Sequence, residues 1–344
     1  MDEPRQAEGG THLLTRRRYV AVLGGMTALF VAVSILAPLI GPAAISFTQA
    51  LSDHESTDFN ILLRVRVPRV LMAGLVGGAL ALSGVTFQAI LRNPLASPFT
   101  LGVSGGAALG AVLAILFAGG GASAGLWIPL AAFAGALAVV FTVHTLAGAR
   151  RHPSPVTLLL AGVVLNFVCA SLIQLVHYYA DLTQSFLMVR WMMGSLDVFE
   201  YRTLAYVAPV VIAILFVLAY HARALNALSA GPDWARSRGV DVKRLVTLNY
   251  FAASLLTGAV VAHSGPIGFV GLIVPHVVRL VLGADHRLLV PCSFLGGGAF
   301  LVVCDTFART ALSPVEVPVG IITAVLGGPF FLWLLLFRRR ELFF

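Results

Sequence analysis

A set of small and polar residues inside one apolar stretch has the spacing of a helix face. Gly162, Asn166, Ala170, Gln174 and His177 follow one another at intervals of four, four, four and three residues, so on a helix they project within one narrow arc. Polar side chains are costly in lipid and usually face a cavity or a neighbouring helix. The face therefore indicates either the lining of a solute pathway or a row of hydrogen bonds between packed helices, and both interpretations stay open.

Two tyrosines follow this set at its C-terminal end. His177 and Tyr179 could ligate haem iron, because imidazole and phenolate both bind ferric iron. Aromatic residues at the end of an apolar stretch are more typical of the belt at a membrane surface. The three cysteines lie in apolar segments without a CxxC spacing, which favours small buried side chains over a disulfide or a metal site.

Residues near the C-terminus predict a second helix face and an ion pair. Gly320 and Thr323, followed by Gly327, present a smooth face of small side chains, which suits a wide solute pathway and tight helix packing equally well. Asp305 and Arg309 are four residues apart, the spacing at which opposite charges on one helix can pair.

The elements that carry these residues must cross a membrane. Hydrophobic residues make up 58% of the chain and charged residues 11%, whereas a soluble domain contains about 25% charged residues. A crossing helix needs about 20 apolar residues, and charge-free stretches of that length recur along the sequence. We predict an all-α polytopic membrane protein with about ten transmembrane helices, over residues 19–43, 68–90, 100–118, 126–147, 156–178, 203–221, 246–263, 267–283, 288–307 and 318–337.

The basic residues predict an orientation. Ten crossings put both termini on one side, and if that side is the cytoplasm, 17 of the 23 lysines and arginines lie inside and six lie outside. This is the positive-inside bias of membrane proteins. The net charge of +8 therefore indicates orientation in membrane lipid rather than a nucleic-acid partner. Residues 1–18 are predicted to be a cytoplasmic tail.

The longest predicted cytoplasmic connection, residues 222–244, has the composition of a docking segment. We expect two short helices hinged at Gly231-Pro232, the first apolar and the second basic. A plain solvated loop would not need the leucines, so docking of a cytoplasmic partner is favoured. The residues in question are Leu225, Leu228, Gly231, Arg236, Arg238 and Lys243.

A phosphate-binding GxxxxGK[ST] loop is excluded by the sequence. The single lysine, Lys243, follows Val242 and precedes Arg244, which does not fit that motif. The chain is therefore not a P-loop ATPase. If the protein uses ATP, another subunit must bind the ATP and its magnesium, and no cofactor is expected in this chain.

Several motifs resemble those of one known family, the permeases of type II ABC importers for iron-siderophores, haem and cobalamin. The resemblance covers nearly the whole chain from about residue 60. The motifs are Arg66-Val67-Pro68-Arg69, Gly84…Gln88, Arg92-Asn93-Pro94-Leu95-Ala96-Ser97-Pro98, Leu101-Gly102-Val103-Ser104-Gly105-Gly106-Ala107, Gly268-Phe269-Val270-Gly271-Leu272…Pro275-His276…Arg279, Asp285-His286-Arg287 and Val317-Pro318-Val319-Gly320-Ile321-Ile322-Thr323.

The resemblance implies an assembly and a set of roles. A single permease domain over residues 19–340 would pair with a second copy, with the pathway at the dimer interface. Two ATPase subunits would dock on the coupling segment 222–244, and a periplasmic substrate-binding protein would dock on the outer side. The outer arginines of the family correspond to Arg66, Arg69 and Arg309, and its inner gate loop corresponds to Ser154, Pro155 and Val156.

The expected function is ATP-driven import of an iron chelate, a siderophore or haem, across the bacterial inner membrane. A cobalamin importer is the alternative. An ion-coupled secondary transporter is a more distant one, because such proteins usually have a buried acidic residue in mid-helix, whereas Asp305 and Glu316 are expected near helix ends.

Overall fold

The computed structural model describes residues 15–43, 45–46, 48, 52–118, 124–148, 155–196 and 200–337, and every regular element within them is helical. Ten helices correspond one to one to the predicted crossings: α1 (Arg16–Leu36), α4 (Val67–Leu91), α5 (Val103–Ala118), α6 (Ala124–Gly148), α7 (Pro155–Tyr179), α9 (Tyr201–Ser229), α11 (Val242–Ser264), α12 (Val270–Leu282), α13 (His286–Thr310) and α14 (Val319–Phe337). Seven are long and apolar enough to cross a membrane, and α5, α12 and α14 are shorter apolar helices.

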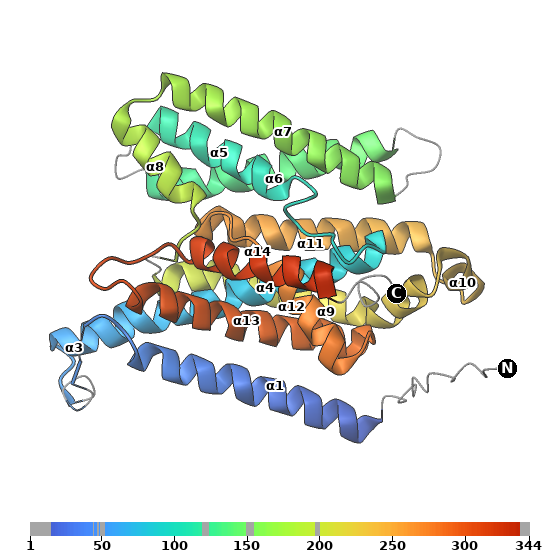
Figure 1. Ribbon diagram of the computed structural model, residues 1–344, viewed down its shortest axis with the longest axis horizontal. Helices are drawn as coiled ribbons and strands as arrows, with labels where there is room; N and C mark the ends of the chain where they lie inside the picture. The colour runs from blue at the N-terminus through green and yellow to red at the C-terminus, as the bar shows by residue number, and fades with distance from the viewer. Residues whose placement is uncertain are drawn as a thin grey trace.

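Short elements join these helices at the two ends of the bundle. They are η1 (Ala37–Leu39), α3 (Thr57–Phe59), the π-helical segment η2 (Asn60–Arg66), α8 (Leu182–Met192) and α10 (Pro232–Ser237). The long helices run roughly along one axis, with α10 at one end of the bundle and α3 and α8 at the other (Figure 1). By the predicted orientation, α10 lies on the cytoplasmic side. We call the α10 end the inner end and the opposite end the outer end.

Two local predictions need correction. The first half of segment 222–244 is not a separate short helix, because α9 continues without a break to Ser229 and only α10 is a short helix of its own. The helix α8 was not predicted. It begins at a capping box in which the Asp181 carboxylate accepts from the Gln184 N–H and the Gln184 side chain accepts from the Asp181 N–H, a pairing that stabilises a helix start.

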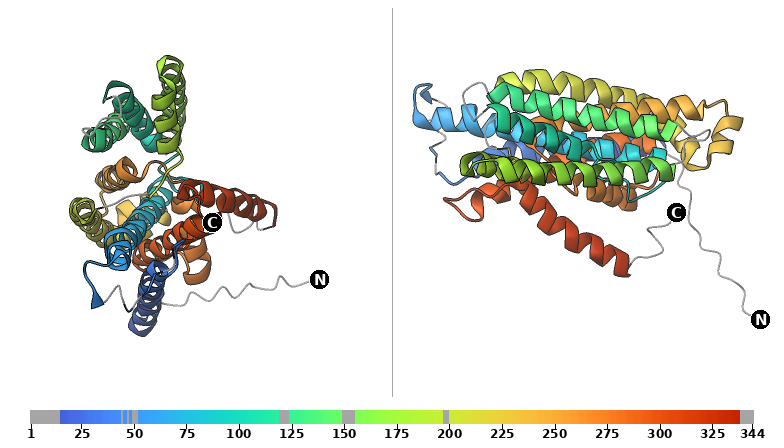
Figure 2. Two further views of the ribbon diagram at one scale, coloured as in Figure 1. Left: turned by 90° about the vertical axis from the view of Figure 1, so that its left-hand side faces the viewer. Right: turned by 90° about the horizontal axis from the view of Figure 1, so that it is seen from above.

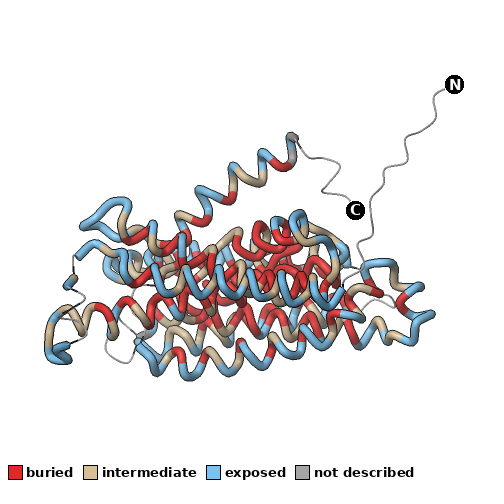
Figure 3. The backbone as a smooth tube through the Cα atoms, turned by 90° about the horizontal axis from the view of Figure 1, so that it is seen from below, coloured by how far each residue is buried: buried red, intermediate tan, exposed pale blue. Residues whose placement is uncertain are grey.

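The centre of the molecule is the contact between α4 and α13. The helix α4 is buried along almost its whole length, and Figure 3 shows the buried residues concentrated in the middle of the bundle. Gly77 of α4 and Gly297 of α13 face each other so closely that a Cβ atom on either would collide with the carbonyl oxygen of the other. Small residues allow such close backbone packing in lipid, where the hydrophobic effect does not drive helices together.

The last helix, α14, is attached differently. Its first part packs closely on the chain and Gly327 lies against the Phe269 side chain, whereas its C-terminal part diverges from the bundle (Figure 2). Val325, Leu332 and Leu336 on this helix are more than half exposed. The first helix, α1, lies along the side of the bundle away from α7 (Figure 2), where Phe30 contacts Gly74 of α4 and Gly298 of α13. The bundle thus has a tightly packed part around α4 and α13 and a loosely attached helix at one side.

The glycine contact can be tested by adding one methyl group. We expect Gly77→Ala to lower the melting temperature of the detergent-solubilised protein, because overpacking typically costs about 1–3 kcal/mol. Gly25→Ala in α1 is the matched control, since a Cβ at that position meets open space. Thermal unfolding of both variants at one scan rate makes the comparison, and equal melting temperatures would contradict the close backbone contact.

Candidate translocation pathway and its two ends

Four of the five residues predicted to share a face of α7 line one cavity. This cavity of about 640 Å³ is bordered by α5, α7, the end of α8 and the loop residues Phe99 and Pro266. Ala170 and Gln174 are exposed to it, and His177 is half-buried. The α7 residues that line it are Asn166, Ala170, Ile173, Gln174 and His177.

The N-terminal part of the same face of α7 packs against neighbouring segments of the chain. Gly162 lies against the backbone of Leu101, where a Cβ atom would come within 2.6 Å of the Leu101 Cα. The Asn166 side-chain amide donates a hydrogen bond to the Phe99 carbonyl oxygen at 2.6 Å. The two interpretations that the sequence leaves open therefore apply to different parts of α7. Gly162 serves helix packing, and Asn166 both forms a hydrogen bond to a neighbouring segment and lines the cavity. Ala170, Gln174 and His177 line the cavity.

The predicted haem ligands do not lie together. His177 lines the cavity, whereas Tyr179 is 73% exposed and is not part of the lining. Met192 at the end of α8 and Met193, which follows it, line the cavity instead. These methionines could not be found from sequence, because their position depends on how α8 folds back onto α5.

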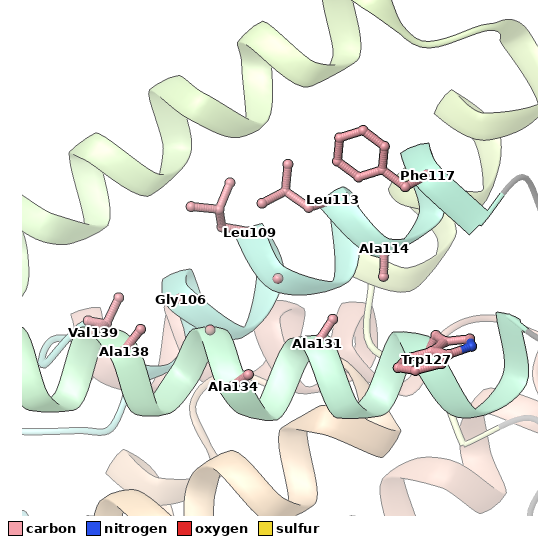
Figure 4. A pocket seen from close by; sticks show the side chains of 12 residues that line it. Gly106, Leu109, Leu113, Ala114, Phe117, Trp127, Ala131, Ala134, Ala138 and Val139 are labelled. Carbon is pink, nitrogen blue, oxygen red and sulfur yellow. The ribbon is translucent and has the colours of Figure 1, made fainter.

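A second cavity is apolar throughout. It measures about 700 Å³ and lies between α5 and α6, whose glycines and alanines allow close approach. Figure 4 shows Leu109, Leu113 and Phe117 on its α5 side and Trp127 with several alanines on its α6 side. The absence of charged side chains from this lining is typical of a surface that faces lipid.

The predicted pathway residues of α14 are covered by the same chain. A Cβ atom on Gly320 would collide with the Met193 carbonyl oxygen, and the Gly320 N–H donates to the Gly194 carbonyl oxygen at 3.1 Å. Thr323 is fully buried and its hydroxyl donates to the Gly320 carbonyl oxygen at 3.0 Å. In this structure the small residues of α14 thus serve packing, and a lining role for them stays a prediction.

A buried ion cluster lies at the outer end of the bundle. The Asp305 carboxylate accepts hydrogen bonds from Arg69 Nη2 at 3.0 Å and from Arg309 Nε at 3.1 Å, and its side chain is completely buried. Arg69 Nη1 also contacts Glu316 Oε2 at 2.7 Å, where the Glu316 side chain is 39% exposed. The predicted pairing of Asp305 with Arg309 is therefore present, and the structure adds Arg69 and Glu316 to it.

Arg66 lies next to this cluster without a carboxylate partner among the described residues. Its guanidinium donates to the carbonyl oxygens of Pro38 and Ala43, so the chain between α1 and α3 folds around it. Arg66, Arg69 and Arg309 thus lie together at the outer end, close to the carboxylates of Asp305 and Glu316, and Asp58 of α3 acts electrostatically on Arg66. All three arginines are at least 95% buried in the isolated chain, so they are less accessible than their predicted role implies.

At the inner end, the structure divides the predicted docking residues into two groups. Leu225 and Leu228 are buried in the core of this chain, so their apolar character reflects internal packing and not an exposed docking surface. Gly231, with φ of +135°, makes the turn into α10 that glycine adopts most readily. The other three predicted residues, Arg236, Arg238 and Lys243, are exposed, and so are Asp233 and Trp234 beside them.

The side chains of α10 form a small, pre-arranged surface. Arg236 Nη1 contacts Asp233 Oδ1 at 2.6 Å, and the Arg238 guanidinium lies 4.6 Å from the centre of the Trp234 ring. Trp234 is 45% exposed and was missed by the sequence reasoning, although a lone tryptophan in a basic segment is a recognisable signal. Of the predicted gate, Pro155 and Val156 lie exposed at the start of α7, and Ser154 is outside the described residues.

These observations define a polytopic helical membrane protein with a cavity among its helices, and comparison with known proteins identifies its class. The model of the FecCD transport family matches residues 28–337. The hemin transport system permease protein HmuU of Yersinia pestis is 39% identical over 324 residues, covering 93% of this chain and 96% of that protein. The vitamin B12 import system permease protein BtuC of Salmonella typhi is 40% identical over 280 residues, covering 80% and 84%.

The solved structures give the same answer. An inward-facing conformation of a metal-chelate type ABC transporter superimposes with a TM-score of 0.81 and 31% identity, covering 93% of this chain and 99% of that chain. The protein is thus the membrane-spanning permease subunit of an ABC importer and not the ATPase. The chain belongs to the FecCD transport family.

Membership in this family confirms several of the sequence predictions. The chain is an all-α, multi-pass protein of a bacterial or archaeal cell membrane with the type II importer fold. Permeases of this kind carry no cofactor, and ATP is bound by a partner ATPase. An ATPase and a binding protein are therefore partners of this chain.

The cavity beside α7 should be accessible to water. In a background without the three native cysteines, Ala170→Cys and Gln174→Cys should react with a charged thiol reagent, and their rates should change when ATP binds to the assembled transporter. Val168→Cys is the matched control, because Val168 is exposed on the same helix but does not line the cavity. Equal rates at all three positions in every nucleotide state would show that this cavity is not a water-filled space.

Proposed function

We propose that this permease imports an iron chelate, with haem as the first substrate to test. The observation that carries the proposal is the near full-length similarity to a hemin transport permease, 93% of this chain against 96% of that protein. The cavity beside α7 supports it, since its wall contains His177, Met192 and Met193, and imidazole and thioether groups are haem ligands in other proteins. A ferric siderophore is the next candidate of the same class.

Cobalamin is a second candidate. The cobalamin import permease BtuC of Halobacterium salinarum is 44% identical over 287 residues, a higher identity over a shorter match. The described cavity lining contains no carboxylate or guanidinium group, so a bulky and nearly neutral complex of either kind fits its chemistry. Similarity at this level does not separate the two substrates, and a transport measurement is needed.

The proposed assembly has two copies of this chain, two ATPase subunits and one periplasmic binding protein. In Figure 2, α7 and α14 stand at the outside of the bundle on adjoining sides, where a second copy can pack against them. Movement of the ATPase subunits would act on segment 222–244 through the exposed side chains of α10. The bundle would then alternate between openings at Pro155 and Val156 on the inner side and at His177 on the outer side.

The substrate is tested with the complete transporter in proteoliposomes, together with its own ATPase and binding protein. We expect saturable, ATP-dependent uptake of labelled haem or a ferric siderophore, with cobalamin a poor competitor. His177→Ala should reduce haem uptake, while Tyr179→Phe, which alters an exposed ring outside the cavity, should not. Uptake of cobalamin alone would overturn the iron-chelate proposal, and uptake driven by an ion gradient without the ATPase would overturn the transport mechanism.

The proposed docking of the binding protein on the outer arginines has a specific test. Arg66→Gln removes a charge while keeping a donor for the Pro38 carbonyl oxygen, and we expect slower association with the binding protein, because charge at an interface mainly steers encounter. Arg64→Gln, which removes an exposed charge from the same segment, is the control. Association rates at several salt concentrations decide the question, and a larger defect in Arg64→Gln would refute the role of Arg66. Arg69 and Arg309 are unsuitable for this test, because their loss strands the buried Asp305 charge.

A further inference from the structure

The motif Asp285-His286-Arg287 makes a set of hydrogen bonds with another helix. It lies at the inner end of the bundle, where α13 begins, and it contacts a residue of α9. Asn226 Nδ2 donates a hydrogen bond to Asp285 Oδ1 at 2.8 Å. Asn226 Oδ1 accepts from the His286 backbone N–H at 2.8 Å and lies 2.8 Å from His286 Nδ1.

The chemistry of these groups makes the contact specific. An amide oxygen can only accept, so His286 Nδ1 must carry a proton and donate. Asp285 also caps α13 by accepting from the Arg287 N–H, and it is held by Arg287 Nε at 3.0 Å. Burial raises the pKa of Asp285, but the hydrogen bonds from Arg287 and Asn226 outweigh burial and lower this pKa to about 2. The carboxylate therefore stays ionised at physiological pH and can accept hydrogen bonds from Asn226 and Arg287 throughout that range.

The contact of Asn226 with Asp285 and His286 joins the end of α9 to the start of α13. Asn226 lies three residues before the end of α9, immediately ahead of Gly231 and the exposed surface of α10. At its other end, α13 carries Asp305 and Arg309 of the outer ion cluster. In between, Gly297 brings the backbone of α13 into close contact with Gly77 and Ala81 of α4. Displacement of the α9–α10 junction would thus reach the outer end as movement of a rigid unit.

We propose that Asn226 is a positioning residue that couples movement of α10 to α13, through its paired hydrogen bonds with Asp285 and His286. The proposal rests on the proposed function of segment 222–244 as the ATPase docking segment. It assigns the Asp285-His286-Arg287 motif to the same coupling. The residue touches neither ATP nor substrate, so its loss should affect the transmission of motion between subunits and not hydrolysis itself.

The test exchanges the two polar partners in the complete transporter. Asn226→Asp places two carboxylates against each other, and we expect uptake per ATP hydrolysed to fall about tenfold, within the range of coupling between distant sites. Basal ATP hydrolysis should persist. The double variant Asn226→Asp/Asp285→Asn restores one amide and one carboxylate, and asparagine remains a good helix cap, so coupling should recover. If Asn226→Asp does not accumulate in the membrane, Asn226→Ala takes its place.

His221→Ala is the matched control. His221 lies on the same helix and its Nδ1 is 3.3 Å from Asn249 Oδ1 of α11, so its loss removes a contact from α9 to a different neighbour. This variant should keep its coupling ratio. If loss of a contact of α9 only destabilises the structure, the melting temperature, uptake and ATP hydrolysis should fall together in both Asn226→Asp and His221→Ala. That outcome would overturn the proposal. Normal coupling in Asn226→Asp, or no recovery in the double variant, would also overturn it.

The proposed function fails in a distinguishable way. If the ATPase neither co-purifies with the wild-type chain nor depends on it for coupled uptake, segment 222–244 is not its docking site. If the wild-type transporter is coupled and Asn226→Asp is equally coupled, the docking role stands and only the role of Asn226 is refuted.

Discussion

Lipid supplies no hydrophobic force to hold one helix against another, so the association of α4 with α13 depends on close packing and on paired polar groups. Both are present. Gly77 and Gly297 bring the two backbones into contact, and Asp305 joins the helices at the outer end through Arg69. A buried carboxylate without its partners would carry an uncompensated charge, which is strongly destabilising. The positions of the other helices follow from this pair, because α1, α9, α11 and α12 all pack around it.

The ten crossings could be predicted from sequence because each is a predominantly apolar stretch with at most one charged residue, and that signal is local. The first half of segment 222–244 was misjudged for an identifiable reason. Leu225 and Leu228 were interpreted as an exposed docking surface, whereas the first residues able to end α9 are Gly231 and Pro232. The short helix α8 was missed, although the Asp181 and Gln184 spacing of its capping box was available. Helix ends are determined by such caps more than by hydrophobicity.

Only those features of the candidate pathway and its outer end that depend on spacing within a single helix could be predicted from sequence. Periodicity placed Ala170, Gln174 and His177 on one face of α7, and the four-residue spacing paired Asp305 with Arg309. Neither the periodicity nor the four-residue spacing indicates which other helix packs against these residues. The contacts of Arg69 with Asp305, of Asn226 with Asp285 and of Gly320 with Met193 join segments that are far apart in sequence. For the same reason a face of small residues on α14 could indicate a pathway or a packing surface, and only its neighbours distinguish the two.

The distribution of contacts separates the parts of the bundle that resist movement from those that permit it. Around α4 and α13, moving one helix alone would break glycine contacts and expose a buried ion pair, so these helices must move together. The C-terminal part of α14 and the exposed face of α7 make few such contacts within the chain, and displacing them costs little. Polar contacts join the rigid part to both surfaces, through Asn226 at the inner end and through Arg69 and Arg309 at the outer end. A subunit that must respond to partners on both sides of a membrane requires both a rigid group of helices and helices that can move. If all helices were equally mobile, a displacement at the inner end would be lost in small local movements and would not reach the outer end.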